Sequence, residues 1–148
     1  MRSLVVDDLL LCRKLLGLIL SPHGEVDHAP DGDEAVRLFQ VALEEGRPYD
    51  LVCLDVSMPH RDGCSVLRDI RQFEAQRGIE LGNGSKIFMT TGSTEQVLDT
   101  FREGADAYVL KPVRAPEFQK LLDKFKLSTV VKSSALRRDR LREFTPSK

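Results

Sequence analysis

The sequence predicts an α/β fold in which a parallel sheet of five strands is covered by helices on both faces. Short apolar runs alternate with amphipathic stretches through the first 127 residues, which is the pattern of strands interleaved with helices. The chain has 148 residues, of which 41% are apolar and 30% charged, so it is long enough to fold as one domain around its own core. This composition excludes collagen-like, low-complexity and wholly disordered chains.

Five apolar runs have the length and composition of strands. The run at 26–29 is the weakest of them, and the run at 49–54 is the clearest. Because crossover helices separate the runs, the strands are expected to be parallel and buried on both faces. The predicted strands are residues 4–6, 26–29, 49–54, 86–91 and 107–110.

Each predicted strand is followed by apolar residues at helical spacing. Pro22 and Gly24 end the first helix, Gly46 ends the second, and Gly104 ends the fourth. Pro116 lies near the first turn of the last helix, where proline is favoured. The helical spacing covers residues 11–20, 35–43, 66–73, 97–101 and 116–125.

The end of the chain differs from the rest in charge. Residues 129–148 carry six basic and two acidic side chains, whereas the whole chain has a net charge of −1. We therefore predict one domain over 1–127 and a basic extension or linker over 128–148. The arginines could also contact nucleic acid, but about 20 residues cannot hold a DNA-binding domain, so no direct DNA binding is expected.

The sequence favours a cytoplasmic protein without membrane insertion. No apolar stretch approaches the ~20 residues of a membrane span, and the start of the chain has no export leader. The three cysteines are odd in number and form no CxxC pair, which favours a reducing compartment and argues against a disulfide framework. Cys53 is predicted to be a small core residue.

Polar residues stand at the carboxyl ends of four predicted strands, where open parallel sheets bind ligands. Neighbouring carboxylates raise one another's pKa unless a cation compensates them, and Mg²⁺ prefers oxygen ligands that include phosphate oxygens. A lysine, a hydroxyl and a glycine amide suit phosphoryl oxygens. The pattern therefore predicts a site for phosphoryl chemistry, formed by Asp7, Asp8, Asp55, Thr91, Gly92 and Lys111.

Four motifs follow one another along the chain: Val5-Val6-Asp7-Asp8, Leu54-Asp55-Val56-Ser57-Met58-Pro59 with Asp62-Gly63, Met89-Thr90-Thr91-Gly92, and Ala107-Tyr108-Val109-Leu110-Lys111-Pro112. In their order and spacing they together resemble the receiver domain of two-component response regulators, over about residues 1–127. The resemblance implies a doubly wound, flavodoxin-like sheet with the strand order 2-1-3-4-5.

The resemblance also implies a phosphorylation site. Asp55 would accept a phosphoryl group from a phosphohistidine on a histidine kinase or a histidine phosphotransfer protein. Asp8, Asp55 and the backbone carbonyl of Ser57 would hold Mg²⁺ or Mn²⁺, with Asp7 acting through a metal-bound water.

By the same resemblance, Thr91, Gly92 and Lys111 would bind the phosphoryl group. Thr91 and Tyr108 would move with it and change the surface around the fourth helix, fifth strand and fifth helix, where a downstream protein or a second copy would dock. The Lys111-Pro112 bond is expected to be cis.

Three hydroxyl residues depart from or add to this pattern. Ser57 and Ser93 occupy positions that vary in the family and tune the lifetime of the phosphoryl group. Thr90 places a hydroxyl where the family's strand is usually apolar, and the sequence offers no function for it.

Each site residue also has a purely structural interpretation, and the combination of motifs argues against all of them holding at once. These alternatives are a helix start for Asp7 and Asp8, a turn for Asp55, strand propensity for Thr91, a solvated surface for Lys111 and core packing for Tyr108.

Two other functions compete with a phosphorylation switch. A phosphatase with an aspartyl-phosphate intermediate, as in the haloacid dehalogenase family, needs an acid two residues after its nucleophile, where this chain has Ser57. A binding scaffold without phosphorylation typically loses part of the acid and lysine set, which this chain keeps.

Two further groups of residues are assigned from the sequence. Leu9, Leu10 and Leu11 follow the acid pair; core packing is preferred for them over exposure for docking of the phosphodonor. His23, His28 and His60 show no ligand spacing and are predicted to lie on the surface.

Overall fold

A computed structural model describes residues 1–95, 97 and 103–128 and shows one parallel sheet with the strand order β2-β1-β3-β4-β5. The fold class and the strand order are therefore confirmed, and β4 and β5 have the predicted bounds. The strands are β1 (Arg2–Val6), β2 (Glu25–Ala29), β3 (Leu51–Asp55), β4 (Lys86–Thr91) and β5 (Ala107–Leu110).

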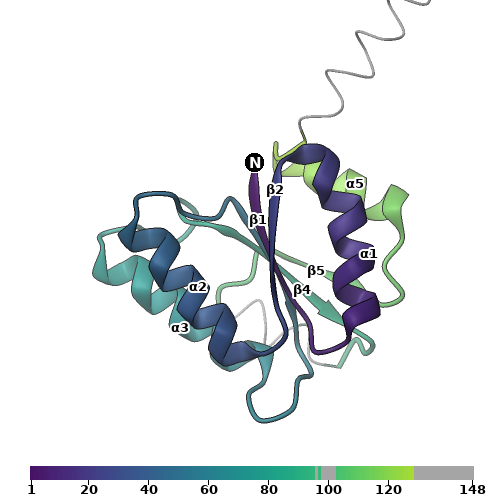
Figure 1. Ribbon diagram of the computed structural model, residues 1–148, viewed down its shortest axis with the longest axis horizontal. Helices are drawn as coiled ribbons and strands as arrows, with labels where there is room; N and C mark the ends of the chain where they lie inside the picture. Colours follow the sequence, from purple (N-terminus) through teal and green to yellow (C-terminus); the bar gives the residue numbers. More distant parts are fainter. Residues whose placement is uncertain (96, 98–102, 129–148) are drawn as a thin grey trace, which may run out of the picture.

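Helices cover both faces of the sheet, as Figure 1 shows, with α2 and α3 on one face and α1 and α5 on the other. The fourth predicted helix, around Leu98 and Phe101, and the extension after residue 128 lie outside the described residues, so the boundary at 127 stays a prediction. The described helices are α1 (Leu10–Leu20), the 3₁₀ turn η1 (Ser21–His23), α2 (Gly32–Glu44), α3 (Gly63–Gln76) and α5 (Ala115–Lys124).

Side chains of the sheet alternate between two apolar cores. Leu4 and Leu54 face α2 and α3, where Phe39 is fully buried. Val5 and Cys53 face α1 and α5, so Cys53 is a core residue as predicted. The same alternation places the odd-numbered residues of β1, β3 and β5 on the α1 and α5 face. Asp7, Asp55 and Lys111 continue these odd-numbered rows.

Aspartates begin the two helices on the α2 and α3 face. The carboxylate of Asp31 accepts from the amide of Glu34 at 2.8 Å, and the carboxylate of Asp62 accepts from the amide of Ser65 at 2.8 Å. Each satisfies an amide that has no partner inside its own helix. The Asp62 cap thereby fixes where the loop after Asp55 ends.

Arg71 on α3 links three segments at one side of the sheet. Its guanidinium donates to Glu74 at 2.6 Å and to Asp106 at 2.9 Å, and it also reaches the carbonyl oxygens of Gly104 and Ser85. Glu74 is buried and also accepts from the Ser85 amide at 2.8 Å. The buried carboxylate of Glu74 and the guanidinium of Arg71 thus compensate each other's charge. The network ties α3 to the approaches of β4 and β5.

The prediction for His23 was wrong, whereas His28 and His60 are exposed as predicted. His23 is 4% exposed because η1 folds the chain back against the start of β1. The approach there is close: a Cβ atom on Gly24 would stand 1.9 Å from the carbonyl oxygen of Met1. Cys12 and Cys53 form no disulfide in the described part of the chain. No helix in the described ranges combines the length and the apolar character that crossing a bilayer requires.

Candidate functional site

Two buried carboxylates and one ammonium meet where β1, β3 and β5 end. The Nζ atom of Lys111 lies 2.9 Å from Oδ2 of Asp7 and 3.3 Å from Oδ1 of Asp55. Asp7 is fully buried and Asp55 is 3% exposed. The sheet brings these residues together because parallel strands end at the same edge, as the sequence predicted.

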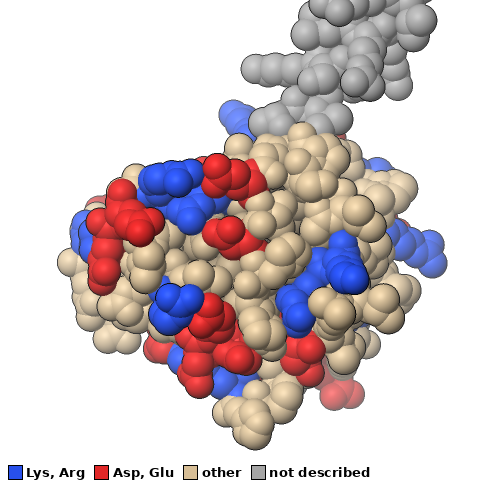
Figure 2. Space-filling view, viewed as in Figure 1, with Lys and Arg blue, Asp and Glu red and all other residues tan. Residues whose placement is uncertain are grey.

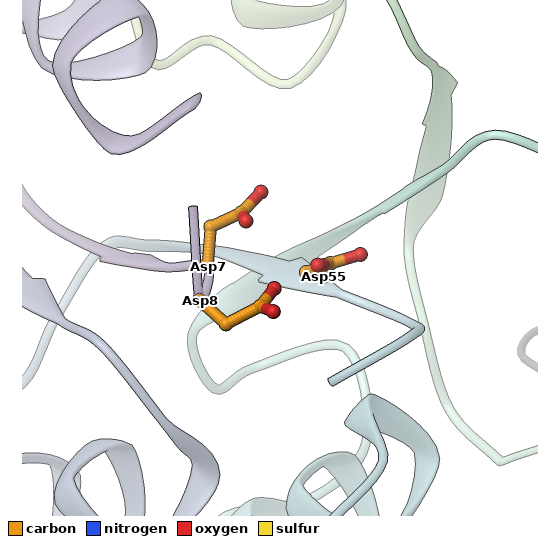
Figure 3. Close-up of side chains that lie close together, drawn as sticks. All are labelled: Asp7, Asp8 and Asp55. Carbon is orange, nitrogen blue, oxygen red and sulfur yellow. The ribbon is translucent and has the colours of Figure 1, made fainter. Parts of the chain in front are cut away.

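A third carboxylate completes an acidic cluster. One carboxylate oxygen from each of Asp7, Asp8 and Asp55 lies within 4.8 Å of the others. Figure 3 shows the Asp8 and Asp55 side chains directed toward a shared space, with Asp7 above it. Asp8 is exposed, so this space communicates with solvent. Clustered carboxylate oxygens fit a hard divalent cation, which would offset their mutual repulsion.

The surroundings of Asp55 disfavour its charged form. Burial, and then the charge of Asp7, raise the pKa of Asp55 to about 6 from an ordinary value of 3.8. The ammonium of Lys111 and the Ser57 amide, 3.2 Å from Oδ1 of Asp55, act in the opposite direction. Further positive charge near the cluster would favour the ionised form of Asp55.

Lys111 stays a cation in this setting. Burial alone would lower the pKa of Lys111, but its hydrogen bond to Asp7 and the charge of Asp55 raise the pKa above its usual value. An ammonium is no metal ligand, but it can bind an anionic oxygen. Lys111 therefore supplies the positive charge on one side of the cluster.

A cavity of about 450 Å³ opens over the cluster. All residues that the sequence assigned to phosphoryl binding or lifetime line it. Asp7 is fully buried, and Tyr108 is half-buried against the α2 and α3 core. The lining residues are Asp8, Leu9, Asp55, Ser57, Thr91, Gly92, Ser93, Glu95 and Lys111.

Local hydrogen bonds hold the backbone in the cavity wall and in the loop next to it. The hydroxyl of Thr91 donates to the Ser93 carbonyl at 3.0 Å and accepts from the Ser93 amide at 3.1 Å, so it is held in a short turn. The loop that follows Ser57 is closed by the Gly63 amide, which donates to the Val56 carbonyl at 2.9 Å. A Cβ atom on Gly63 would stand 2.2 Å from the carbonyl oxygen of Asp55, which explains glycine there. The Lys111-Pro112 bond is cis, as the resemblance implied.

Two residues near the site were missed by sequence reasoning. Glu95 lines the cavity, and its position two residues after Ser93 in the same turn was the only available signal. Arg13 on α1 donates to the backbone carbonyl of Asp7 at 2.6 Å. Nothing in the sequence marks Arg13, because the contact depends on where α1 crosses the end of β1.

The expectation that Leu9, Leu10 and Leu11 pack in the core was wrong. They are 56%, 56% and 81% exposed, and Leu15 and Leu18 farther along α1 are 41% and 74% exposed. We call these five residues the leucine surface. In Figure 2 the surface over α1 consists mostly of uncharged side chains, with one group of basic side chains among them. The leucines point away from the sheet because Leu16 and Leu20 occupy the buried face of α1.

Comparison with known proteins places the chain in a family. The family model of the response regulator receiver domain matches residues 3–123 of the sequence. The chemotaxis protein CheY of Halobacterium salinarum is 37% identical over 116 residues, which cover 76% of this chain and 86% of that protein. The transcriptional regulatory protein DltR of Streptococcus agalactiae is 35% identical over 144 residues, covering 96% of this chain but 57% of DltR.

Solved structures agree with this assignment. The receiver domain of the histidine kinase CKI1 from Arabidopsis thaliana, complexed with Mg²⁺ and BeF₃⁻, superposes with a TM-score of 0.72 at 28% identity and covers 86% of this chain and 90% of its own. CheY of Borrelia burgdorferi in the CheX-CheY-BeF₃⁻-Mg²⁺ complex superposes with a TM-score of 0.70 at 28% identity, covering 84% of this chain and 89% of that one. The chain belongs to the response regulator receiver domains of two-component signalling systems.

Proposed function

We propose that the chain is a phosphorylation switch in which Asp55 accepts a phosphoryl group from a phosphohistidine. The observation that carries the proposal is the position of Asp55, whose buried carboxylate meets Lys111 and faces the cavity. The donor would be a histidine kinase or a histidine phosphotransfer protein, in keeping with the receiver-containing histidine kinases among its relatives.

The transfer is a single displacement at phosphorus. A carboxylate oxygen of Asp55 forms the new P–O bond, the P–N bond of the phosphohistidine breaks, and the imidazole leaves with the electron pair and takes up a proton. Lys111, the Thr91 hydroxyl and the Gly92 amide stabilise the phosphoryl oxygens. The product is an acyl phosphate on the carboxylate.

A divalent cation, Mg²⁺ or Mn²⁺, fits the acidic cluster, with Asp8, Asp55 and the Ser57 carbonyl as ligands and Asp7 acting through water. When bound, it supplies positive charge between the carboxylates and the incoming phosphoryl group. The fit rests on the three carboxylates within 4.8 Å of one another and on the raised pKa of Asp55. In the same pocket, Ser57 and Ser93 would govern how freely water reaches the acyl phosphate.

The output of the switch is a change of binding face. Thr91 would follow the phosphoryl oxygen and Tyr108 would turn as it moves, altering the surface near β5 and α5 for a downstream protein or for a second copy of the chain. The site would operate in the cytoplasm. Hydrolysis of its own acyl phosphate would be the one further reaction of the chain.

The leucine surface is the proposed contact of the phosphodonor. Leu9 lines the cavity itself, and the other four leucines extend from it along α1. A partner that covers exposed leucines gains the free energy of burying apolar surface. Docking there would bring the donor histidine to the mouth of the cavity.

Intact-mass spectrometry with acetyl phosphate tests the assignment of Asp55. We expect one phosphoryl adduct in the presence of Mg²⁺, no adduct without the ion, and no adduct on Asp55→Asn in either condition. Glu80→Gln, which changes an exposed carboxyl outside the cavity, should label like the wild type. An adduct of equal yield on Asp55→Asn would show that the acceptor is another residue.

A further inference from the structure

Thr90, the residue before the end of β4, carries a hydroxyl that the proposed chemistry does not use. It is 1% exposed, and its hydroxyl has no hydrogen-bond partner among the residues described. Leaving a buried hydroxyl unpaired is unfavourable, and valine would fill the same space without that cost. A polar side chain in this place therefore calls for an explanation.

The strand register sets Thr90 beside Asp55. Asp55 pairs with Thr90 across β3 and β4, and Thr90 pairs with Val109 across β4 and β5. Paired residues of parallel strands project to the same face of a sheet. Phe88, two residues before Thr90, and Val109 both belong to the core under α1 and α5. The Thr90 side chain thus lies on the face from which Asp55 and Lys111 meet.

Lys111 has to cross β4 to reach its partners. It follows β5 directly, and β4 separates β5 from β3, as Figure 1 and the strand order show. Its Nζ atom nevertheless lies 3.3 Å from Asp55 on β3 and 2.9 Å from Asp7 beyond β1. The lysine side chain therefore passes over the carboxyl end of β4, next to the row that holds Thr90.

The hydrogen-bonding capacities of the two groups match. An ammonium has three N–H donors, and in the described part of the chain the carboxylates of Asp7 and Asp55 accept from it. A threonine hydroxyl can accept from such a donor. One donor of Lys111 and the acceptor of Thr90 thus stand on the same face of the sheet in neighbouring rows.

We propose that Thr90 is a positioning residue for Lys111: its buried hydroxyl beside Asp55 accepts the third N–H of the ammonium through one bridging water. The role rests on the proposed phosphorylation of Asp55. Once an Asp55 oxygen is bonded to phosphorus it carries less negative charge and becomes a weaker acceptor for Lys111. Thr90 would then keep the ammonium over the site while it binds the phosphoryl oxygen.

Three variants test this role. Thr90→Val removes the hydroxyl at nearly constant shape, and Thr90→Ser restores a hydroxyl. Ser3→Ala is the matched control, because Ser3 is also buried with an unpartnered hydroxyl on an odd-numbered position of β1, at the opposite end of the sheet from Asp7. Thermal unfolding of each variant checks that the fold is kept.

The first readout is the apparent affinity for BeF₃⁻ in the presence of Mg²⁺, measured by fluorine NMR. We expect Thr90→Val to weaken this affinity about five- to tenfold, the effect of losing one hydrogen bond, and Thr90→Ser to stay near the wild type. Ser3→Ala should bind as the wild type does. Equal affinity of Thr90→Val and wild type would overturn the role, and so would equal weakening by Ser3→Ala.

The second readout is the nitrogen-15 NMR signal of the Lys111 ammonium in the free protein, assigned with Lys111→Arg. We expect the Lys111 protons to exchange with water about fivefold faster in Thr90→Val, and Thr90→Ser to restore the wild-type rate. An unchanged rate in Thr90→Val would refute the contact with Lys111. If the wild type bound no BeF₃⁻, the proposed function would fail, whereas this second readout would still decide the role of Thr90.

Discussion

Asp55→Asn is expected to stabilise the folded chain at neutral pH in the absence of divalent cations, besides abolishing phosphorylation. The folded-state pKa of Asp55 is raised to about 6, against 3.8 for an ordinary aspartate. Between pH 3.8 and about pH 6 the folded state therefore keeps a proton on Asp55 that the unfolded state has released. The free energy of unfolding falls as the pH rises through this range. The folded-state and ordinary pKa values differ by about 2, so ionising Asp55 above pH 6 lowers the free energy of unfolding by about 3 kcal/mol.

Asparagine cannot ionise and escapes this penalty, and the pKa of about 6 already includes the attraction between Asp55 and Lys111, whose Nζ atom lies 3.3 Å from Oδ1 of Asp55. The expected gain is therefore about 3 kcal/mol at pH 7.5, and it shrinks toward pH 4. Because the chain has no tryptophan, urea unfolding is best followed by far-UV circular dichroism. A gain of the same size at pH 4 and pH 7.5, or none at either, would refute the electrostatic argument. Glu80→Gln is the control and should keep the wild-type pH profile.

Three other predictions follow from the site and its supports. Asp8→Asn should weaken Mn²⁺ binding by at least about tenfold, as measured by electron paramagnetic resonance, and unchanged binding would remove Asp8 from the ligand set. Leu11→Ser should change the free energy of unfolding by no more than about 0.5 kcal/mol, because this leucine is 81% exposed. It should slow phosphotransfer from a phosphohistidine protein but not labelling by acetyl phosphate, and parallel slowing of both would contradict docking at α1. Arg71→Met should cost about 3–5 kcal/mol in urea unfolding, since it leaves the buried Glu74 carboxylate unpaired, and a loss below 1 kcal/mol would show that Glu74 finds other partners.

The fold was predictable because its signals are local. β4 and β5 match their predicted bounds, since each apolar run is closed by polar residues or a proline. β3 begins at Leu51 and ends at Asp55, two residues later and one residue later than the pattern indicated. Tyr49 extends the apolar run but packs beside Phe39, with ring centroids 6.4 Å apart, and so belongs to the core without pairing in the sheet.

The site was predictable where it depends on strand ends and unpredictable where it depends on packing angles. Asp7, Asp55 and Lys111 follow strands and must converge at one edge of a parallel sheet. The exposure of Leu9 and Leu11 depends instead on which face α1 turns to the sheet, and a helix with apolar residues on most sides leaves that choice open. The positions of Arg13 and Glu95 at the site could not be predicted, because they depend on how segments without a shared sequence pattern pack together.

The described chain starts and stops at the same end of the sheet. Met1 and Leu127 both pack against the core under α1 and α5, and strand direction puts the cavity at the far end. Five residues of strand separate the two ends by about 17 Å. Surface immobilisation or a fluorescent label at Met1, or a tether after residue 128, would therefore leave the cavity facing solution, and sensors built on this chain can be anchored there without shielding the reaction they report.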